Sequence, residues 1–177
     1  MNRALLVAVM LVGLTCSAPT WAIDLVADGG DGIGFVAGNV EVSYDGTNVV
    51  VTITSQDPWT LAETHVDVQT DAANVPQHNG NPAPGKFAYA TETAGTEHSY
   101  SIPLAYADGQ TVVIAVHAAL KWLEVVGVAD DAPDRPLDDP ADILHEETGW
   151  GEGTGFSGKN WGMYIEGTFQ EDALVLQ

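Results

Sequence analysis

Leu61-Ala-Glu63-Thr-His65-Val-Asp67-Val68 alternates small or β-branched side chains with polar ones. Read as a β-strand, the stretch presents opposite faces at successive residues. The even-numbered face suits burial, and the odd-numbered face carries Glu63, His65 and Asp67. Neighbours on that face are about 6.6 Å apart at Cα, so long side chains can converge. The stretch is therefore interpreted as a half-buried strand whose other face carries side chains able to bind a ligand.

A second apolar stretch, Thr111 to Trp122, carries His117 at its middle, between Ala115 and Ala119. If this stretch pairs with the first, opposed side chains have Cβ atoms about 5 Å apart. Two imidazoles at that spacing can reach one metal ion through bonds of about 2 Å. The sequence therefore predicts a metal site of His65, His117 and Glu63. Two alternatives stay open: Glu63 hydrogen-bonds a histidine instead of binding the metal, or both histidines are packing residues.

The identity of the metal depends on whether Glu63 is a ligand. Imidazole suits copper, zinc, iron or nickel, and two histidines alone favour Cu(I). A carboxylate shifts the preference towards Cu(II), zinc or a two-histidine, one-carboxylate iron site. Three other histidines are expected at the solvated surface: His78, His98 and His145. No hydrolase motif is present, so a non-enzymatic copper-binding role is predicted, with a mononuclear metal oxidase as an alternative.

The first 22 residues have the pattern of a signal peptide. Arg3 is followed by the apolar run Ala4 to Leu14 and by Thr20-Trp21-Ala22, a small-x-small cleavage site. We expect export to the periplasm, the cell surface or the medium, with no integral membrane segment after cleavage. Residues 23–177 then form a single domain, in which 23–38 and 170–177 are flexible. Cys16 leaves with the signal peptide, so a soft-metal site must use imidazole or thioether.

The chain is strongly acidic, with a formal charge of −20. Nucleic acid and anionic membrane surfaces are improbable partners, because both require basic patches. So acidic a chain attracts cations, although acid-rich surfaces also simply resist aggregation. Two loops rich in aspartate, Asp28 to Gly34 and Asp130 to Asp142, are candidate calcium sites. A calcium-stabilised surface or matrix interaction module without a transition metal is thus an alternative function.

Asp45-Gly46 lies between two alternating stretches and predicts a tight β-hairpin. Many short strands separated by turn residues, without βα alternation, indicate an all-β antiparallel β-sandwich with long loops and little helix. A short helix is expected only over 139–147. The expected strands are 39–44, 47–54, 60–69, 98–104, 111–121 and 162–169.

Several runs resemble the surface-associated copper(I)-binding proteins of methane-oxidising bacteria, the MopE/CorA type. They are Glu63-Thr-His65-Val66, Pro84-Gly-Lys-Phe-Ala-Tyr89, Val113-Ile-Ala-Val-His117-Ala118, and the segment from Glu147 to Tyr164. The resemblance implies that His65 and His117, on neighbouring strands, hold Cu(I). The family's third ligand is a kynurenine, formed from a tryptophan two residues before the first histidine. Glu63 occupies that position here, which removes the kynurenine.

Overall fold

The computed structural model describes residues 19–28, 34–124, 143–170 and 173–177. Antiparallel β-strand accounts for 68% of its described residues, which confirms the all-β prediction, and their only helices are the short 3-10 turns η1 (Ala72–Asn74) and η2 (Pro84–Lys86). The longer strands are β1 (Thr20–Ala27), β2 (Phe35–Tyr44), β3 (Asn48–Ser55), β4 (Thr60–Gln69), β7 (Tyr89–Gly95), β8 (Glu97–Pro103), β9 (Thr111–Glu124), β10 (Ile143–Gly151), β12 (Met163–Gln170) and β13 (Ala173–Leu176). Three short strands complete the set: β5 (Gln77–His78), β6 (Asn81–Pro82) and β11 (Thr154–Gly155).

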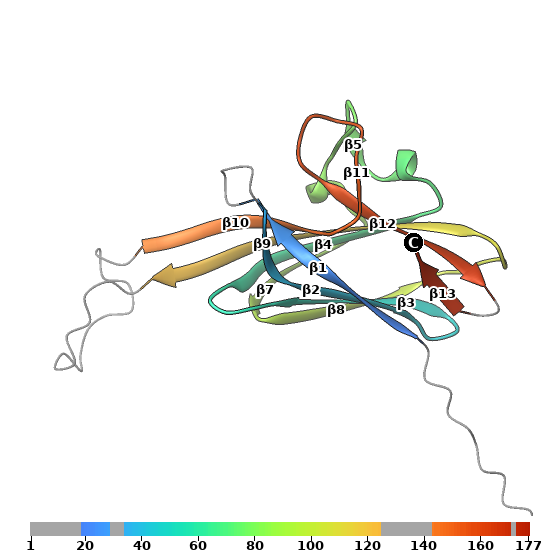
Figure 1. Ribbon diagram of the computed structural model, residues 1–177, viewed down its shortest axis with the longest axis horizontal. Helices are drawn as coiled ribbons and strands as arrows, with labels where there is room; N and C mark the ends of the chain where they lie inside the picture. The colour runs from blue at the N-terminus through green and yellow to red at the C-terminus, as the bar shows by residue number, and fades with distance from the viewer. Residues whose placement is uncertain (1–18, 29–33, 125–142, 171–172) are drawn as a thin grey trace, which may run out of the picture.

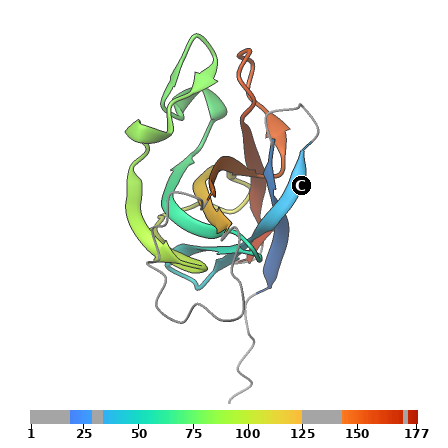
Figure 2. The ribbon, with the colours of Figure 1, turned by 90° about the vertical axis from the view of Figure 1, so that its left-hand side faces the viewer.

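One continuous sheet contains all the longer strands (Figure 1). Eight of them are neighbours in the order β7-β4-β9-β10-β1-β2-β3-β8, while β12 also pairs with β9 and β13 pairs with β12. β9 is central: β4 pairs along one edge, while β12 and then β10 pair along the other. The sheet curls towards closure, as the end-on view shows (Figure 2). Its two outer strands, β7 and β8, are consecutive in the chain. The two packed layers expected of a sandwich are thus parts of a single, nearly closed antiparallel sheet.

The inside of the curled sheet is the main hydrophobic core. Alternate residues of its strands point inward, as the period of two requires. Members that are 0% exposed include Val40, Ile53, Leu61, Val116 and Phe169. Because Glu63, His65 and Asp67 of β4 lie on the opposite face, the candidate site is outside this core.

A β-bulge at Ala62 explains why Leu61 faces the core although it is only two residues before the outward-facing Glu63. Strict alternation would put Leu61 on the same face as Glu63 and His65. In the register, Leu61 lies opposite Leu120 and Glu63 lies opposite Ala119, so one extra residue is inserted between them. An extra residue in one strand reverses the facing of what precedes it. Leu61 is therefore buried in the core while Glu63 and His65 point outward.

The predicted hairpin at Asp45-Gly46 is present between β2 and β3. Gly46 has a φ of +94°, in the range that favours glycine. Asp45 accepts hydrogen bonds from the backbone N–H groups of Thr47 (2.9 Å) and Asn48 (2.7 Å). Hydrogen bonds from Asn48 and Thr47 hold the pKa of Asp45 below its ordinary value. The turn is fixed by these local interactions rather than by packing.

Replacing Gly46 by alanine should therefore lower the free energy of unfolding by about 1 kcal/mol, because an L-residue in this conformation brings its Cβ too close to the backbone. Gly85→Ala is the matched control, since Gly85 has ordinary backbone torsion and open space around a new Cβ. Urea unfolding of the two variants tests the difference. Equal stabilities would contradict the assignment of strain to Gly46.

The helix expected over 139–147 is wrong where the structure describes it. Residues 143–151 form β10, which pairs with β9 along His117–Glu124 and with β1 at its far end. This non-local pairing overrides a weak local preference for helix. Residues 139–142 lie outside the described residues. The strand expected over 60–69 has the observed bounds, and β1, β7, β10 and β13 were not expected.

The chain ends also contribute strands. The expected cleavage point after Ala22 falls within β1, where Thr20 to Ala27 pair with β2. The Trp21 indole N–H donates to the Leu174 carbonyl oxygen at 2.9 Å, which links β1 to β13. Within 23–38 and 170–177, expected as flexible ends, the described residues are mostly strand. Among the described residues, no helix has the length and hydropathy needed to cross a membrane.

Candidate metal site

His65 and His117 face each other across the pairing of β4 and β9. They are direct register partners, and their Nδ1 atoms are 3.3 Å apart. The two ring centroids are 5.3 Å apart with planes inclined at 47°. The alternation seen in each stretch of sequence thus brings both imidazoles to the outer face, with their Nδ1 atoms in contact.

Glu63 lies at the other end of the His65 ring. Its Oε1 atom is 3.0 Å from His65 Nε2, whereas His117 is on the Nδ1 side. An ionised carboxylate is an acceptor without a donor, so its position favours a hydrogen on His65 Nε2. His65 is 4% exposed, while the Glu63 side chain is 45% exposed. Glu63 therefore connects a buried imidazole to the solvent edge of the site.

His117 is partly buried against the ring of Trp150. Trp150 is its register partner on β10, with ring centroids 4.9 Å apart in an edge-to-face arrangement. Burial, and secondarily the charge of nearby His65, lower the pKa of His117 from 6.5 to about 4. His117 is consequently an uncharged imidazole at neutral pH, the form that binds metals.

Trp150 is held in place by a second hydrophobic cluster on the outer face of the sheet. Phe87 and Phe156 each lie 6.3 Å from it, centroid to centroid. These rings belong to the segments around β5, η2 and β11, which form a lobe above the sheet (Figure 1). The lobe therefore packs against the tryptophan that contacts His117.

Asp67, the third polar residue of the β4 face, attaches this lobe to the sheet. It is 1% exposed and accepts hydrogen bonds from the Ala88 backbone N–H (2.9 Å) and the Gln69 amide (2.6 Å). Its register partner is Ala115, one of the small residues beside His117. Buried carboxylates are tolerated when hydrogen-bonded in this way. Asp67 therefore positions the covering lobe through Ala88.

The separation of the two Nδ1 atoms sets the geometry of any ion between them. With bonds of about 2.0 Å, a 3.3 Å separation gives a nitrogen–metal–nitrogen angle of about 110°. A linear arrangement would need the nitrogens about 4 Å apart, a movement of less than 1 Å. Within the described part of the chain, no three histidine, cysteine, aspartate or glutamate side chains are grouped to hold a metal ion. The site offers two imidazole donors.

The remaining histidines have other surroundings. His78 is exposed, and His98 packs against Tyr100 with centroids 4.7 Å apart. His145 stacks on Trp122 at 4.5 Å and contacts Glu124 through Nε2 at 3.0 Å. None of these contacts joins them to the pair on β4 and β9. The surface location expected from the sequence fits His78 best.

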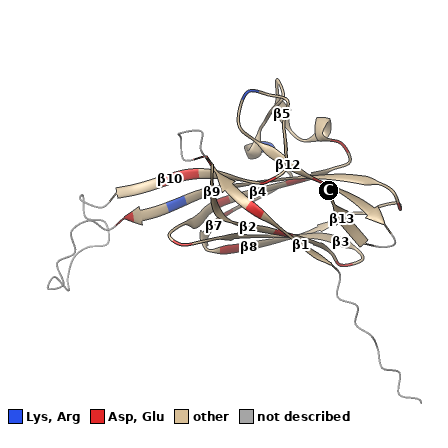
Figure 3. Ribbon diagram, in the orientation of Figure 1, with Lys and Arg blue, Asp and Glu red and all other residues tan. Residues whose placement is uncertain are grey.

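Carboxylates are spread over the described strands rather than gathered at one point (Figure 3). Cations are few: Lys86, Lys121 and Lys159 are the lysines and arginines of the described residues. Both loops proposed for calcium fall wholly or largely outside those residues, since 29–33 and 125–142 are not described. The acidic field therefore surrounds the histidine pair without forming a described carboxylate site.

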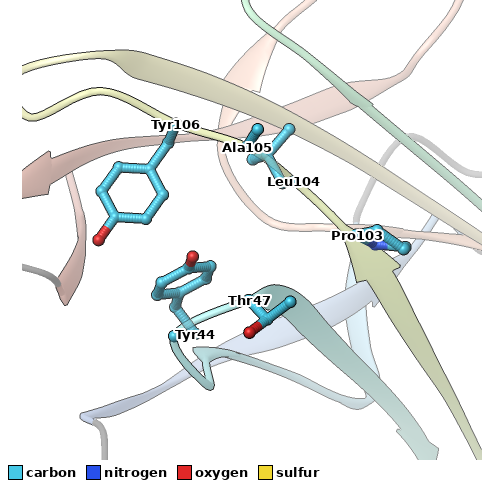
Figure 4. A pocket seen from close by; sticks show the side chains of 7 residues that line it. Tyr44, Thr47, Pro103, Leu104, Ala105 and Tyr106 are labelled. Carbon is cyan, nitrogen blue, oxygen red and sulfur yellow. The ribbon is translucent and has the colours of Figure 1, made fainter.

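A well-formed hollow lies elsewhere on the molecule. It measures about 480 Å³ and is lined by residues of the β2–β3 turn and of the segment after β8, among them Tyr44, Thr47, Leu104 and Tyr106 (Figure 4). No residue of the histidine site lines it. A smaller hollow of about 340 Å³ borders Ala119 and Thr148, next to Glu63 in the register.

Trp150 is the residue of the site that sequence reasoning did not find. It lies in a glycine-rich stretch, Gly149 to Gly162, which the composition indicates to be a loop with anchoring tryptophans. In the structure Trp150 is 4% exposed and occupies a strand beside His117. The alternation of Thr148 and Trp150 is a signal too short to read without the pairing to β9.

The chain was compared with protein-family models, curated proteins and solved structures, and nothing matches it.

Proposed function

We propose that this chain binds one copper ion, as Cu(I), between the Nδ1 atoms of His65 and His117. The observation that carries the proposal is the 3.3 Å contact between these two atoms. Two neutral imidazole nitrogens, with no third donor, suit the low coordination numbers of Cu(I). Capture or storage of copper outside the cytoplasm is the role that fits such a site.

The contact between the histidines is also compatible with a hydrogen bond in the metal-free protein. One Nδ1–H can donate to the other Nδ1. The hydrogen bond belongs to the metal-free state of the pair, and the shared ion belongs to its metal-bound state. In the metal-free state the two Nδ1 atoms are partnered by each other, and among the described residues no buried side-chain nitrogen or oxygen lacks a hydrogen-bond partner. Binding of a cation by both nitrogens gives that arrangement a function.

The surroundings of the pair support holding an ion rather than catalysis. Trp150 and the lobe above it cover one side, and His65 is 4% exposed. A reaction at the metal needs open positions and room for a substrate. The acidic surface raises the local concentration of cations. The apolar run near the N-terminus, Ala4 to Leu14, supports export.

The purified full-length chain can be titrated anaerobically with Cu(I) in competition with a chromogenic chelator. We expect one copper per chain, and X-ray absorption with nitrogen donors at about 2.0 Å. Parallel titrations with Zn²⁺ and Ca²⁺ measure selectivity. Absence of stoichiometric copper, with no change in the melting temperature, would assign the pair to packing, because a ligand that binds the folded state must raise stability.

A further inference from the structure

We infer that Glu63 is a positioning residue that locks the tautomer of His65 so that Nδ1 is the metal-binding nitrogen. The consequence for metal binding rests on the proposed function, whereas the tautomer is a property of the metal-free protein and does not. Glu63 Oε1 lies 3.0 Å from His65 Nε2, where a carboxylate favours a hydrogen on that nitrogen, and an imidazole in its uncharged form carries one hydrogen. With that hydrogen on Nε2, a lone pair is left on Nδ1. Nδ1 is the atom that faces His117.

The placement of Glu63 argues against direct ligation of an ion shared by the two histidines. The nitrogens of one imidazole lie at different edges of the ring, and Glu63 contacts Nε2 while the ion would sit at Nδ1. Carboxylates in this outer position orient a ligating histidine and raise its basicity. The donor set then consists of imidazole nitrogens without a carboxylate, which is the set that favours Cu(I) over Cu(II) or zinc.

With the tautomer of His65 fixed, metal binding must change the tautomer of His117. In the metal-free protein the hydrogen between the rings must belong to His117 Nδ1, because His65 Nδ1 holds a lone pair. When an ion binds at both Nδ1 atoms, the hydrogen leaves Nδ1 of His117 and Nε2 of that ring carries one instead, so the imidazole stays uncharged. His65 is thus the fixed member of the pair and His117 the adaptable one.

The tautomer can be read directly in the metal-free protein. Long-range proton–nitrogen correlation spectra of the ¹⁵N-histidine-labelled chain distinguish a hydrogen on Nε2 from one on Nδ1. We expect His65 to be Nε2-protonated in the wild type and in Glu63→Gln, whose amide oxygen can still accept. Glu63→Ala should show a mixture of tautomers. A wild-type His65 with its hydrogen on Nδ1 would overturn the inference, whatever the protein does with copper.

Copper affinity separates positioning from ligation. Glu63→Ala should lose about 10- to 100-fold in Cu(I) affinity, the range typical of outer-shell partners of metal ligands. Glu63→Gln should retain affinity within about threefold of a charge control, Glu92→Gln. Glu92 is exposed and is the register partner of Glu63 on β7, so it removes one charge from the same surface without touching His65.

Each outcome is decisive. A loss in Glu63→Gln as large as in Glu63→Ala would make Glu63 a direct ligand, because an amide replaces the hydrogen bond but not a carboxylate–metal bond. A loss in Glu92→Gln equal to that in Glu63→Ala would reduce the effect to surface charge. Failure of the wild type to bind copper would remove the proposed function and leave the tautomer result standing. Glu63 is partly exposed, so these variants should fold, which their melting temperatures will verify.

Discussion

Replacing His117 by phenylalanine should lower the affinity for Cu(I) by at least about 100-fold, more than is typical for the loss of an outer-shell partner. The change removes one of two nitrogen donors and keeps an aromatic ring against Trp150. A single remaining imidazole has no chelating partner at 3.3 Å. Anaerobic chelator competition measures the loss directly. Retained stoichiometric binding would show that the ion is held elsewhere.

Two further variants make this test specific. His65→Gln should have an effect as large as that of His117→Phe, because both donors are needed for the shared geometry. His78→Ala is the matched control, since His78 is exposed and has no contact with the pair. It should bind copper as the wild type does. Loss of binding in His78→Ala would point to unspecific coordination by surface histidines.

The positions of His65 and His117 could be anticipated because each lies within a long alternating stretch. Period-two alternation states which face a residue occupies without any knowledge of its neighbours. The opposition of the two stretches was a hypothesis, and the register of β4 with β9 establishes it. The orientation of the imidazole rings is not encoded in alternation. The orientation of the His65 ring decides that Glu63 contacts its Nε2 atom and His117 its Nδ1 atom, and only the three-dimensional structure gives that orientation.

The features that sequence reasoning missed arise from non-local pairing. β1 and β10 are adjacent in the sheet although more than a hundred residues separate Leu25 from its partner Gly151. β10 reads locally as acidic and then glycine-rich, so neither half resembles a buried strand. The bulge at Ala62 is equally invisible in a strict alternation, which would leave Leu61 exposed. Such elements follow from how the sheet closes rather than from their own residues.

The stability of the metal-free protein should fall as the pH is lowered from about 6.5 to about 4, through a contribution from His117. Burial and the charge of His65 lower its pKa to about 4, whereas in the unfolded chain it is near 6.5. Between these values the unfolded state binds more protons than the folded state, so the free energy of unfolding rises with pH. The contribution is therefore complete above pH 6.5 and lost progressively below it. Its full size is about 3 kcal/mol.

Urea unfolding in the presence of a copper chelator, at several values of pH from 7 to 4, measures this term when wild type is compared with His117→Phe. Carboxylates titrate over the same range, but they do so in both proteins and cancel in the difference. The stability of the wild type relative to the variant should decrease by about 3 kcal/mol between pH 7 and pH 4. Parallel curves would mean that His117 accepts a proton in the folded state as readily as in the unfolded one. In that case Trp150 and the lobe above it do not exclude water from the imidazole, and protons would compete with copper for His117 at about pH 6.5 rather than at about pH 4.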